Sequence, residues 1–298
     1  MTITRKDTII SLPDGVELAA WLYVPEGDGP FPAVTMAHGL GGIRQQGLEP
    51  VAERIAEAGY VVSLHDHRNF GASTGTPRHD IDPWQQIEDW RRVIAFLQTR
   101  GEVDHARIGI WGTSFSGGHA IVLGATDRAI KAVYAQVPTV DGFAAGQRRI
   151  PPHLVKEADA RFAADEVAQA RGEAPARQAF ASADPDVQAL FRAPDAVGFY
   201  LQDIPEGAVW ENSVTLQSIR RTRYYSPGWF IDKISPTPLF MLVGDDDMIT
   251  LPDLSLKAYE QALQPKQLKI VPGGHFDPYR AGLEESISAA IRFFGEHL

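Results

Sequence analysis

The spacing of apolar residues predicts a chain in which strands and helices alternate. Residues 8–12 and 16–23 alternate between apolar and polar positions on either side of a turn at Asp14 and Gly15, which predicts a peripheral antiparallel hairpin. Beyond it, short apolar runs predict strands at residues 33–36, 60–64, 107–111, 130–137, 238–243 and 268–271. Apolar residues spaced three or four apart predict helices at 48–58, 84–97, 115–125, 256–263 and through Ile291 and Phe294.

This order of elements determines the expected fold class. Because parallel strands that alternate with helices form a sheet covered on both faces, we expect an α/β fold with a mostly parallel central sheet flanked by helices. On the second predicted helix, Trp84, Ile87 and Trp90 recur at helical spacing. That spacing predicts that all three side chains belong to the core.

The alternation stops between Pro138 and Pro236, and the composition changes there. The segment is first rich in Ala, Arg and Glu and then in aromatic residues, which are Phe199, Tyr200, Trp210, Tyr224, Tyr225, Trp229 and Phe230. A structureless loop of this length is rare in a compact domain, so we expect a mainly helical cap over the carboxyl edge of the sheet. The predicted division is a core at 1–139, a cap at 140–235 and the rest of the core at 236–298.

The aromatic residues of the cap have two interpretations that the sequence leaves open. Aromatic side chains commonly line the pockets of small-molecule sites. They equally form the seam between a cap and a core. Under the first interpretation, Trp210, Tyr224 and Phe230 are candidates for substrate binding.

Composition and charge exclude several classes of partner. The 298 residues include 28 basic and 38 acidic side chains, a net charge of −10, which disfavours binding to nucleic acid or to anionic lipid. No cysteine is present, so disulfides, thiolate metal sites and cysteine nucleophiles are excluded. No apolar signal-peptide segment follows Arg5 and Lys6. We therefore expect a cytoplasmic protein with no nucleic-acid or membrane partner.

A serine and a histidine stand where an enzyme of this fold class would need them. Ser114 lies between a predicted strand and a predicted helix, in the run Gly112-Thr113-Ser114-Phe115-Ser116-Gly117-Gly118. Small flanking residues allow a tight turn that exposes the hydroxyl at the sheet edge, although Ser116 stands where the usual Gly-x-Ser-x-Gly pattern has glycine. A serine nucleophile requires a base, and His275 follows the last predicted strand at the same edge.

An acid is needed to orient that imidazole. Asp245, Asp246 and Asp247 follow the strand at 238–243, between the serine and the histidine in chain order, as in serine hydrolases with this turn. Side chains alternate along an extended chain, so Asp245 and Asp247 would share a face and Asp246 is disfavoured. Asp141, after the preceding strand, is the next candidate.

An acyl-transfer reaction also needs donors for a developing oxyanion. The backbone N–H of Phe115 directly follows the candidate nucleophile, and that of Leu40 lies in the loop His38-Gly39-Leu40 after the first parallel strand. These two groups are the predicted oxyanion hole.

His65 and His67 offer two potential zinc ligands, too few for a zinc site. Their neighbours Asp66, Arg68 and Ser73 are better explained as residues that fix the loop after the strand through hydrogen bonds and an ion pair.

The motifs together resemble the α/β-hydrolase superfamily, over residues 8–137 and 236–298. The resemblance rests on the order Ser114, Asp247, His275, on His38-Gly39 and on Asp66-His67-Arg68-Asn69-Phe70-Gly71-Ala72-Ser73. More narrowly, residues 111–118 and Gln136-Val137-Pro138 are similar to bacterial dienelactone-hydrolase-like proteins and to fungal polyketide transferases. In the superfamily the acid commonly stands three residues after the glycine that ends its strand. The resemblance therefore implies Asp247, counted from Gly244.

The resemblance further implies a Ser–His–Asp enzyme with no metal and no organic cofactor. The leading hypothesis is a serine hydrolase that cleaves carboxylic esters, or amides or lactones, of a small-molecule substrate. Ser114 would form the acyl-enzyme, with His275 as general base and Asp247 as the orienting acid. An alternative is an acyltransferase that passes the same acyl group to an alcohol or amine. A non-catalytic ligand receptor on a hydrolase scaffold is the third hypothesis.

Overall fold

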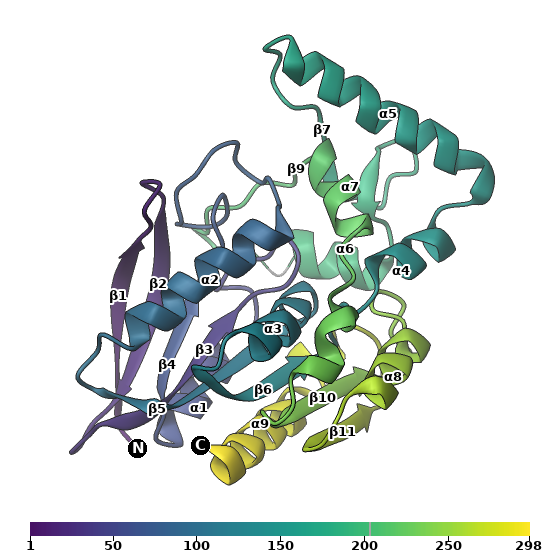
Figure 1. Cartoon of the computed structure of the whole chain (residues 1–298). Helices are drawn as coiled ribbons and strands as arrows, with labels where there is room; N and C mark the ends of the chain where they lie inside the picture. Colours follow the sequence, from purple (N-terminus) through teal and green to yellow (C-terminus); the bar gives the residue numbers. More distant parts are fainter. Residues whose placement is uncertain (203) are drawn as a thin grey trace.

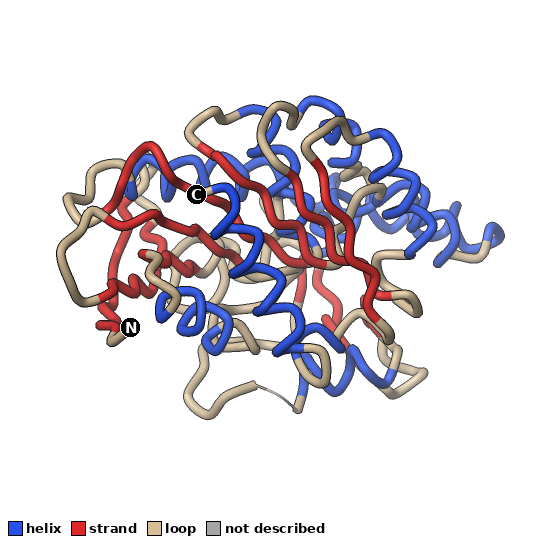
Figure 2. The backbone as a smooth tube through the Cα atoms, turned by 90° about the horizontal axis from the view of Figure 1, so that it is seen from below, coloured by secondary structure: helices blue, strands red, loops and turns tan. Residues whose placement is uncertain are grey.

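The centre of the protein is an eight-stranded, mostly parallel sheet (Figures 1 and 2), seen in a computed structural model that describes residues 1–202 and 204–298. The strand order is β1-β2-β4-β3-β5-β6-β10-β11. The strands are β1 (Ile3–Ser11), β2 (Glu17–Pro25), β3 (Phe31–Ala37), β4 (Val61–His65), β5 (Val103–Thr113), β6 (Ile130–Gln136), β10 (Leu239–Gly244) and β11 (Lys266–Val271). The pairs β1–β2 and β2–β4 are antiparallel and the remaining pairs are parallel. The predicted α/β fold and the N-terminal hairpin are confirmed.

Helices cover both faces of this sheet, as the alternating pattern predicted. In Figure 1, α2, α3 and α8 lie on one face, and α1 and α9 lie on the other. Their bounds are α1 (Glu49–Glu57), α2 (Pro83–Leu97), α3 (Phe115–Thr126), α8 (Pro252–Gln261) and α9 (Leu283–His297). No helix in the described residues has the length and apolar character needed to span a membrane.

The three residues at helical spacing on α2, which are Trp84, Ile87 and Trp90, are only partly in the core. Ile87 and Trp90 are buried, but Trp84 is 51% exposed, so the prediction for Trp84 was wrong. The physical reason is its place in the first turn, two residues after the capping residue Asp82. Its ring contacts Tyr225 edge-on at a centroid distance of 5.7 Å and covers the seam instead of entering the core.

The loop after β4 is fixed in the way that the sequence predicted. Ser73 Oγ donates to the Asp66 carbonyl at 2.7 Å, and Asp66 Oδ2 accepts from Arg44 Nη1 at 2.9 Å. Arg68 forms ion pairs with Asp14 and Asp89.

Residues between β6 and β10 form the mainly helical insertion, which lies at one end of the sheet in Figure 1. Its helices are α4 (Gly142–Arg149), α5 (Pro152–Ala170), α6 (Pro194–Leu201), α7 (Leu216–Arg223) and the 3-10 helix η1 (Pro227–Lys233). The sequence did not predict a further three-stranded sheet of β7 (Arg177–Ala181), β8 (Ala189–Phe191) and β9 (Val214–Thr215). We call residues 140–235 the cap, and the division of the chain into core and cap remains a prediction. The last short helix, η2 (Asp277–Tyr279), follows β11.

Candidate active site

Ser114 occupies a strained turn between β5 and α3. Its φ and ψ are +55° and −118°, a region that side-chain-bearing residues rarely adopt. Gly112 is needed two residues earlier, because a Cβ there would stand 2.1 Å from the Ser116 carbonyl oxygen. The turn places Ser114 at the N-terminus of α3, where backbone N–H groups favour negative charge.

The predicted base and acid lie in line with Ser114. Ser114 Oγ is 2.8 Å from His275 Nε2, and His275 Nδ1 is 2.7 Å from Asp247 Oδ2. His275 follows β11, Asp247 follows β10 and Ser114 follows β5. The carboxyl ends of three parallel strands thus bring together residues that lie far apart in the sequence. Acid, imidazole and hydroxyl form one continuous hydrogen-bonded chain.

Asp247 is the only one of the three consecutive acids that the fold buries. Its Oδ1 accepts the N–H groups of Ile249 and Thr250 at 2.6 and 2.8 Å, and Thr250 Oγ1 lies 2.7 Å from its Oδ2. Burial raises the pKa of this carboxyl, but the neighbouring His275 and the hydrogen bonds from His275 and Thr250 outweigh burial. The pKa of Asp247 therefore lies below its ordinary value. Sequence reasoning missed Thr250, because nothing in the local pattern marks it.

The other acids that the sequence offered have structural partners. The exposed Asp245 accepts the Gly273 N–H at 2.8 Å, which links the loop after β10 to the loop that carries His275. Asp141 caps α4 by accepting the Ala144 N–H at 2.9 Å. Asp141 and Asp245 therefore hold turns, and neither has a hydrogen bond to His275 in the described part of the chain.

The loop after β3 passes directly over the candidate nucleophile. A Cβ on Gly39 would meet the Ser114 Cβ at 2.9 Å, so only glycine allows this approach. Leu40 and Phe115, the predicted oxyanion donors, line the same cavity as Ser114 and His275. Phe115 is the first residue of α3, so its N–H has no acceptor within the helix. The Leu40 N–H donates no hydrogen bond among the residues described.

Two cap residues support the loop that carries Leu40. Tyr200 Oη donates to the Leu40 carbonyl at 2.7 Å, and Trp210 Nε1 donates to the Gly41 carbonyl at 2.8 Å. Both carbonyls are thereby directed toward the cap. Sequence reasoning did not predict these contacts, because they join segments about 160 residues apart.

Behind the turn, the contacts of Ser116 explain why serine stands where the usual Gly-x-Ser-x-Gly pattern has its last glycine. The Ser116 hydroxyl donates to the His38 carbonyl, so His67 Nε2, 2.8 Å away, must donate to Ser116 Oγ. Desolvation and the neighbouring His38 lower the pKa of His67 to about 3, which keeps its ring neutral. The chain His67–Ser116–His38 ties the turn to the loop that carries Leu40.

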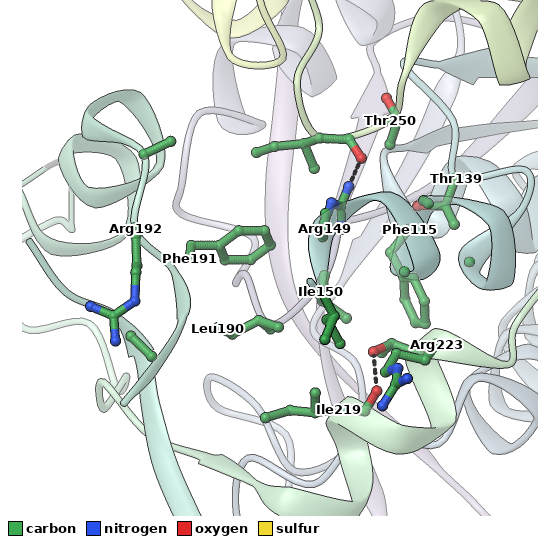
Figure 3. Close-up of a pocket in the computed structure, with 18 of the residues that line it drawn as sticks. Phe115, Thr139, Arg149, Ile150, Leu190, Phe191, Arg192, Ile219, Arg223 and Thr250 are labelled. Atoms are coloured by element: carbon green, nitrogen blue, oxygen red, sulfur yellow. Dashed lines mark hydrogen bonds between the residues drawn. The ribbon is translucent and has the colours of Figure 1, made fainter. Parts of the chain in front are cut away.

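A cavity of about 640 Å³ extends from Ser114 and His275 into the cap. The core contributes Leu40, Phe115, Thr139 and Thr250, and the cap contributes residues of α4, α5, β8 and α7. Figure 3 shows Leu190 and Phe191 of β8 on one side of this space and Phe115 and Thr139 on the other. Apolar and charged cap residues therefore surround the space in front of the candidate nucleophile.

The three cap residues predicted to bind substrate are placed elsewhere. Trp210 supports the Leu40 loop, Tyr224 is 56% exposed and stacks on Phe143, and Phe230 contacts Trp84. None is among the residues that line the described cavity. Of the aromatic residues that the sequence singled out, Tyr200 is the one on the cavity wall. Trp210, Tyr225 and Phe230 contact the core and form the seam, and Tyr224 and Trp229 are exposed.

Comparison with known proteins identifies the family. The family described as X-Pro dipeptidyl-peptidase (S15 family) matches residues 14–277. The chain belongs to this family. It is also 33% identical over 264 residues to the quorum-quenching protein AidA of Acinetobacter baumannii, which covers 89% of this chain and 86% of AidA.

Two further relatives are fungal. Polyketide transferase grgF of Penicillium sp. is 27% identical, covering 100% of this chain and 98% of grgF. The crystal structure of the α/β hydrolase GrgF superposes with a TM-score of 0.85 at 25% identity, over 99% of each chain. The thiohydrolase aneE of Aspergillus aculeatus is 28% identical, covering 86% of this chain and 81% of aneE. The chain is thus an α/β-hydrolase superfamily enzyme that acts on ester-type bonds.

Proposed function

We propose that this S15-family enzyme is a serine hydrolase that cleaves carboxylic esters or thioesters of a small molecule through an acyl-enzyme on Ser114. The observation that carries the proposal is the hydrogen-bonded chain from Asp247 through His275 to Ser114. It ends at a cavity lined by Leu40 and Phe115, whose backbone N–H groups have no acceptor within residues 1–202 and 204–298. Nucleophile, base, orienting acid and oxyanion donors are the four parts that such a reaction requires.

The geometry supports the following sequence of steps. Ser114 Oγ attacks the substrate carbonyl carbon while His275 Nε2 takes the hydroxyl proton, and the carbonyl oxygen becomes an oxyanion between the N–H groups of Leu40 and Phe115. The imidazolium is stabilised by Asp247 and gives its proton to the departing alcohol or thiol. Water, deprotonated by His275, then attacks the acyl-enzyme, which releases the carboxylic acid and restores Ser114.

Acyl transfer is the second candidate, and the polyketide-transferase relative favours it. The first half of the reaction is the same, and an alcohol or amine replaces water in the second half. Product analysis separates the two reactions: the enzyme is incubated with an activated ester, with and without an alcohol acceptor. Only a transferase converts most of the acyl group into the new ester at acceptor concentrations far below that of water.

The proposal is tested by labelling the enzyme with a fluorophosphonate probe. We expect one equivalent of probe on Ser114, located by peptide mass spectrometry, and neither labelling nor turnover of 4-nitrophenyl esters by a folded Ser114→Ala variant. Labelling at another serine, or near-normal turnover by Ser114→Ala, contradicts the proposal. A wild-type protein that binds acyl compounds but neither labels nor turns over would be the receptor of the third hypothesis.

A further inference from the structure

The cavity wall carries more positive charge than a protein with a net charge of −10 would suggest. Its basic residues are Arg149, Arg161, Arg192 and Arg223, and its acidic residues are Asp141, Glu157 and Asp195. Some of these charges already have partners. Asp141 caps α4, and Arg223 pairs with Asp159 at 3.3 Å. The guanidinium of Arg192 is turned away from the cavity centre in Figure 3 and donates to backbone carbonyls.

Arg149 differs from its neighbour on the same helix. Arg148 makes two hydrogen bonds of 2.8 Å to the carboxylate of Asp253. Arg149 donates to the Ile249 carbonyl, and no carboxylate oxygen lies within 4 Å of it among the described residues. A guanidinium has five N–H donors arranged as a fork. Arg149 therefore lines the cavity as a solvent-accessible guanidinium with no carboxylate partner in the described part of the chain.

Arg149 also lies close to the catalytic end of the cavity. Its acceptor, Ile249, belongs to the loop that donates two N–H groups to Asp247. In Figure 3, Arg149 lies between Phe191 and Thr250. Desolvation by the surrounding protein lowers its pKa, and the negative charge of Asp247 partly opposes this. A guanidinium nevertheless stays charged at neutral pH.

A guanidinium on a cavity wall that has no carboxylate partner can bind an anion through its free N–H donors. We infer that Arg149 binds a carboxylate, or an equivalent anion, carried by the acyl part of the substrate. The inference rests on the proposed function and deepens it: the preferred substrates are esters or thioesters of acyl groups that bear a negative charge away from the reacting carbonyl. The apolar residues Ile150, Leu190 and Phe191 would contact the carbon chain between the two groups.

The competing explanation is that Arg149 only anchors the Ile249 carbonyl and so the loop that carries Asp247. The two explanations differ in which substrates respond to a substitution. Loss of an anion-binding group affects charged substrates alone, mainly through KM, whereas loss of a loop anchor lowers kcat for all of them.

The experiment compares matched pairs of substrates of equal length. The charged member is the 4-nitrophenyl monoester of adipic, pimelic or suberic acid, and the neutral member is its ω-amide. We expect wild-type enzyme to prefer the acid in kcat/KM by about tenfold or more for at least one chain length. In Arg149→Gln this preference should fall by about tenfold, equivalent to about 1.4 kcal/mol, with little change for the amides. Arg149→Lys should keep part of the preference.

Two control variants make the result specific to Arg149. Arg148→Gln removes an adjacent arginine that does not line the cavity and should leave the acid-to-amide preference unchanged. Arg161→Gln removes a second cavity arginine, on α5, whose Nη2 donates to Gln178 Oε1 at 3.4 Å, and it should leave the preference largely intact. The inference is overturned by a wild-type preference below about twofold, by loss of preference in Arg161→Gln instead, or by an equal loss with acids and amides in Arg149→Gln.

A binding measurement separates failure of this inference from failure of the proposed function. Suberic acid monoamide is titrated calorimetrically into Ser114→Ala and into Ser114→Ala combined with Arg149→Gln. We expect the second protein to bind about tenfold more weakly. This result does not depend on turnover, so it would survive if Ser114 proved not to be the nucleophile. Conversely, labelling of Ser114 without any acid-to-amide preference would overturn the anion site alone.

Discussion

Single atoms determine how the candidate site works. Ser116 illustrates this, because its hydroxyl accepts from His67 and donates to the His38 carbonyl. Removing it leaves a buried N–H and a buried carbonyl without partners, which costs about 1–3 kcal/mol. It also frees the loop whose Leu40 N–H is proposed to bind the oxyanion. Ser116 is thus a positioning residue.

We expect Ser116→Ala to lower the free energy of unfolding by about 1–3 kcal/mol and kcat by about tenfold or more, with KM little changed. Urea denaturation and ester kinetics measure both effects. Ser286→Ala is the control, since Ser286 is also buried on α9 and donates to the carbonyl of Gly282, the residue before that helix. It should lose stability without losing kcat. A similar kcat for Ser116→Ala and wild type would show that the link is structural only.

The three consecutive acids provide a second prediction at this scale. Removing the carboxylate that orients a catalytic histidine costs on the order of 10⁴ in kcat, so Asp247→Asn should lose about that factor. Asp245→Asn should stay within about tenfold, because its carboxylate only holds the Gly273 N–H. Steady-state kinetics on one ester decides between them. A large loss in Asp245→Asn with a small loss in Asp247→Asn would mean that the acid is assigned to the wrong residue.

At this scale the sequence could predict those candidate site residues that directly follow a predicted strand. Ser114, Asp247 and His275 each follow a recognisable strand, and parallel strands bring such residues to one edge. Thr250 and Arg149 could not be found in the same way. Their roles depend on where a side chain points after the cap has packed on the core, and no local spacing encodes that.

At the scale of elements, the cap determines the shape of the cavity. Phe191, on the short strand β8, lines the cavity, whereas Tyr224 is exposed and stacks on Phe143 outside it. We expect Phe191→Ala to change the ratio of kcat/KM between long and short 4-nitrophenyl esters by about tenfold, because Phe191 is partly buried and a partial aromatic contact with the acyl chain contributes about half of the roughly 1.5–3 kcal/mol of full burial. Tyr224→Ala should leave the ratio within about twofold.

The fluorophosphonate reaction provides the control for this prediction. A small probe needs the nucleophile but little of the acyl pocket, so the labelling rate of Ser114 should change less in Phe191→Ala than the ester ratio does. Equal losses with every ester and with the probe would instead indicate that Phe191 stabilises the cap structurally.

The elements of the core followed from periodicity, while those of the cap did not. The inner parallel strands are largely buried on both faces and read as apolar runs, whereas the edge strand β11 is only partly buried. In contrast, β8 and β9 span only three and two residues, too short for any period to be visible. The sequence therefore predicted a mainly helical cap without placing its helices, and it missed the sheet, and with it Leu190 and Phe191 on the cavity wall.

At the scale of the whole molecule, neutral histidines lie buried behind the site. Desolvation lowers the pKa of His38 to about 4, and desolvation with the charge of His38 lowers that of His67 to about 3. In an unfolded chain both rings titrate near their ordinary pKa of about 6.5. Between these limits the unfolded chain binds more protons than the folded one, so the free energy of unfolding falls as the pH falls through this window.

Each such histidine contributes a slope of up to about 1.4 kcal/mol per pH unit. We predict that the wild-type protein loses stability steadily from about pH 6.5 to pH 4, measured by urea denaturation at a series of pH values. In His67→Gln the side-chain amide can still donate to Ser116, but one titrating group is gone. The slope of the unfolding free energy against pH should therefore decrease by up to about 1.4 kcal/mol per pH unit, the contribution of one proton. His105→Gln, on the exposed surface, should keep the wild-type slope. If His67→Gln also kept it, the ring of His67 would have to be protonated in the folded protein, which would contradict its role as a neutral donor to Ser116.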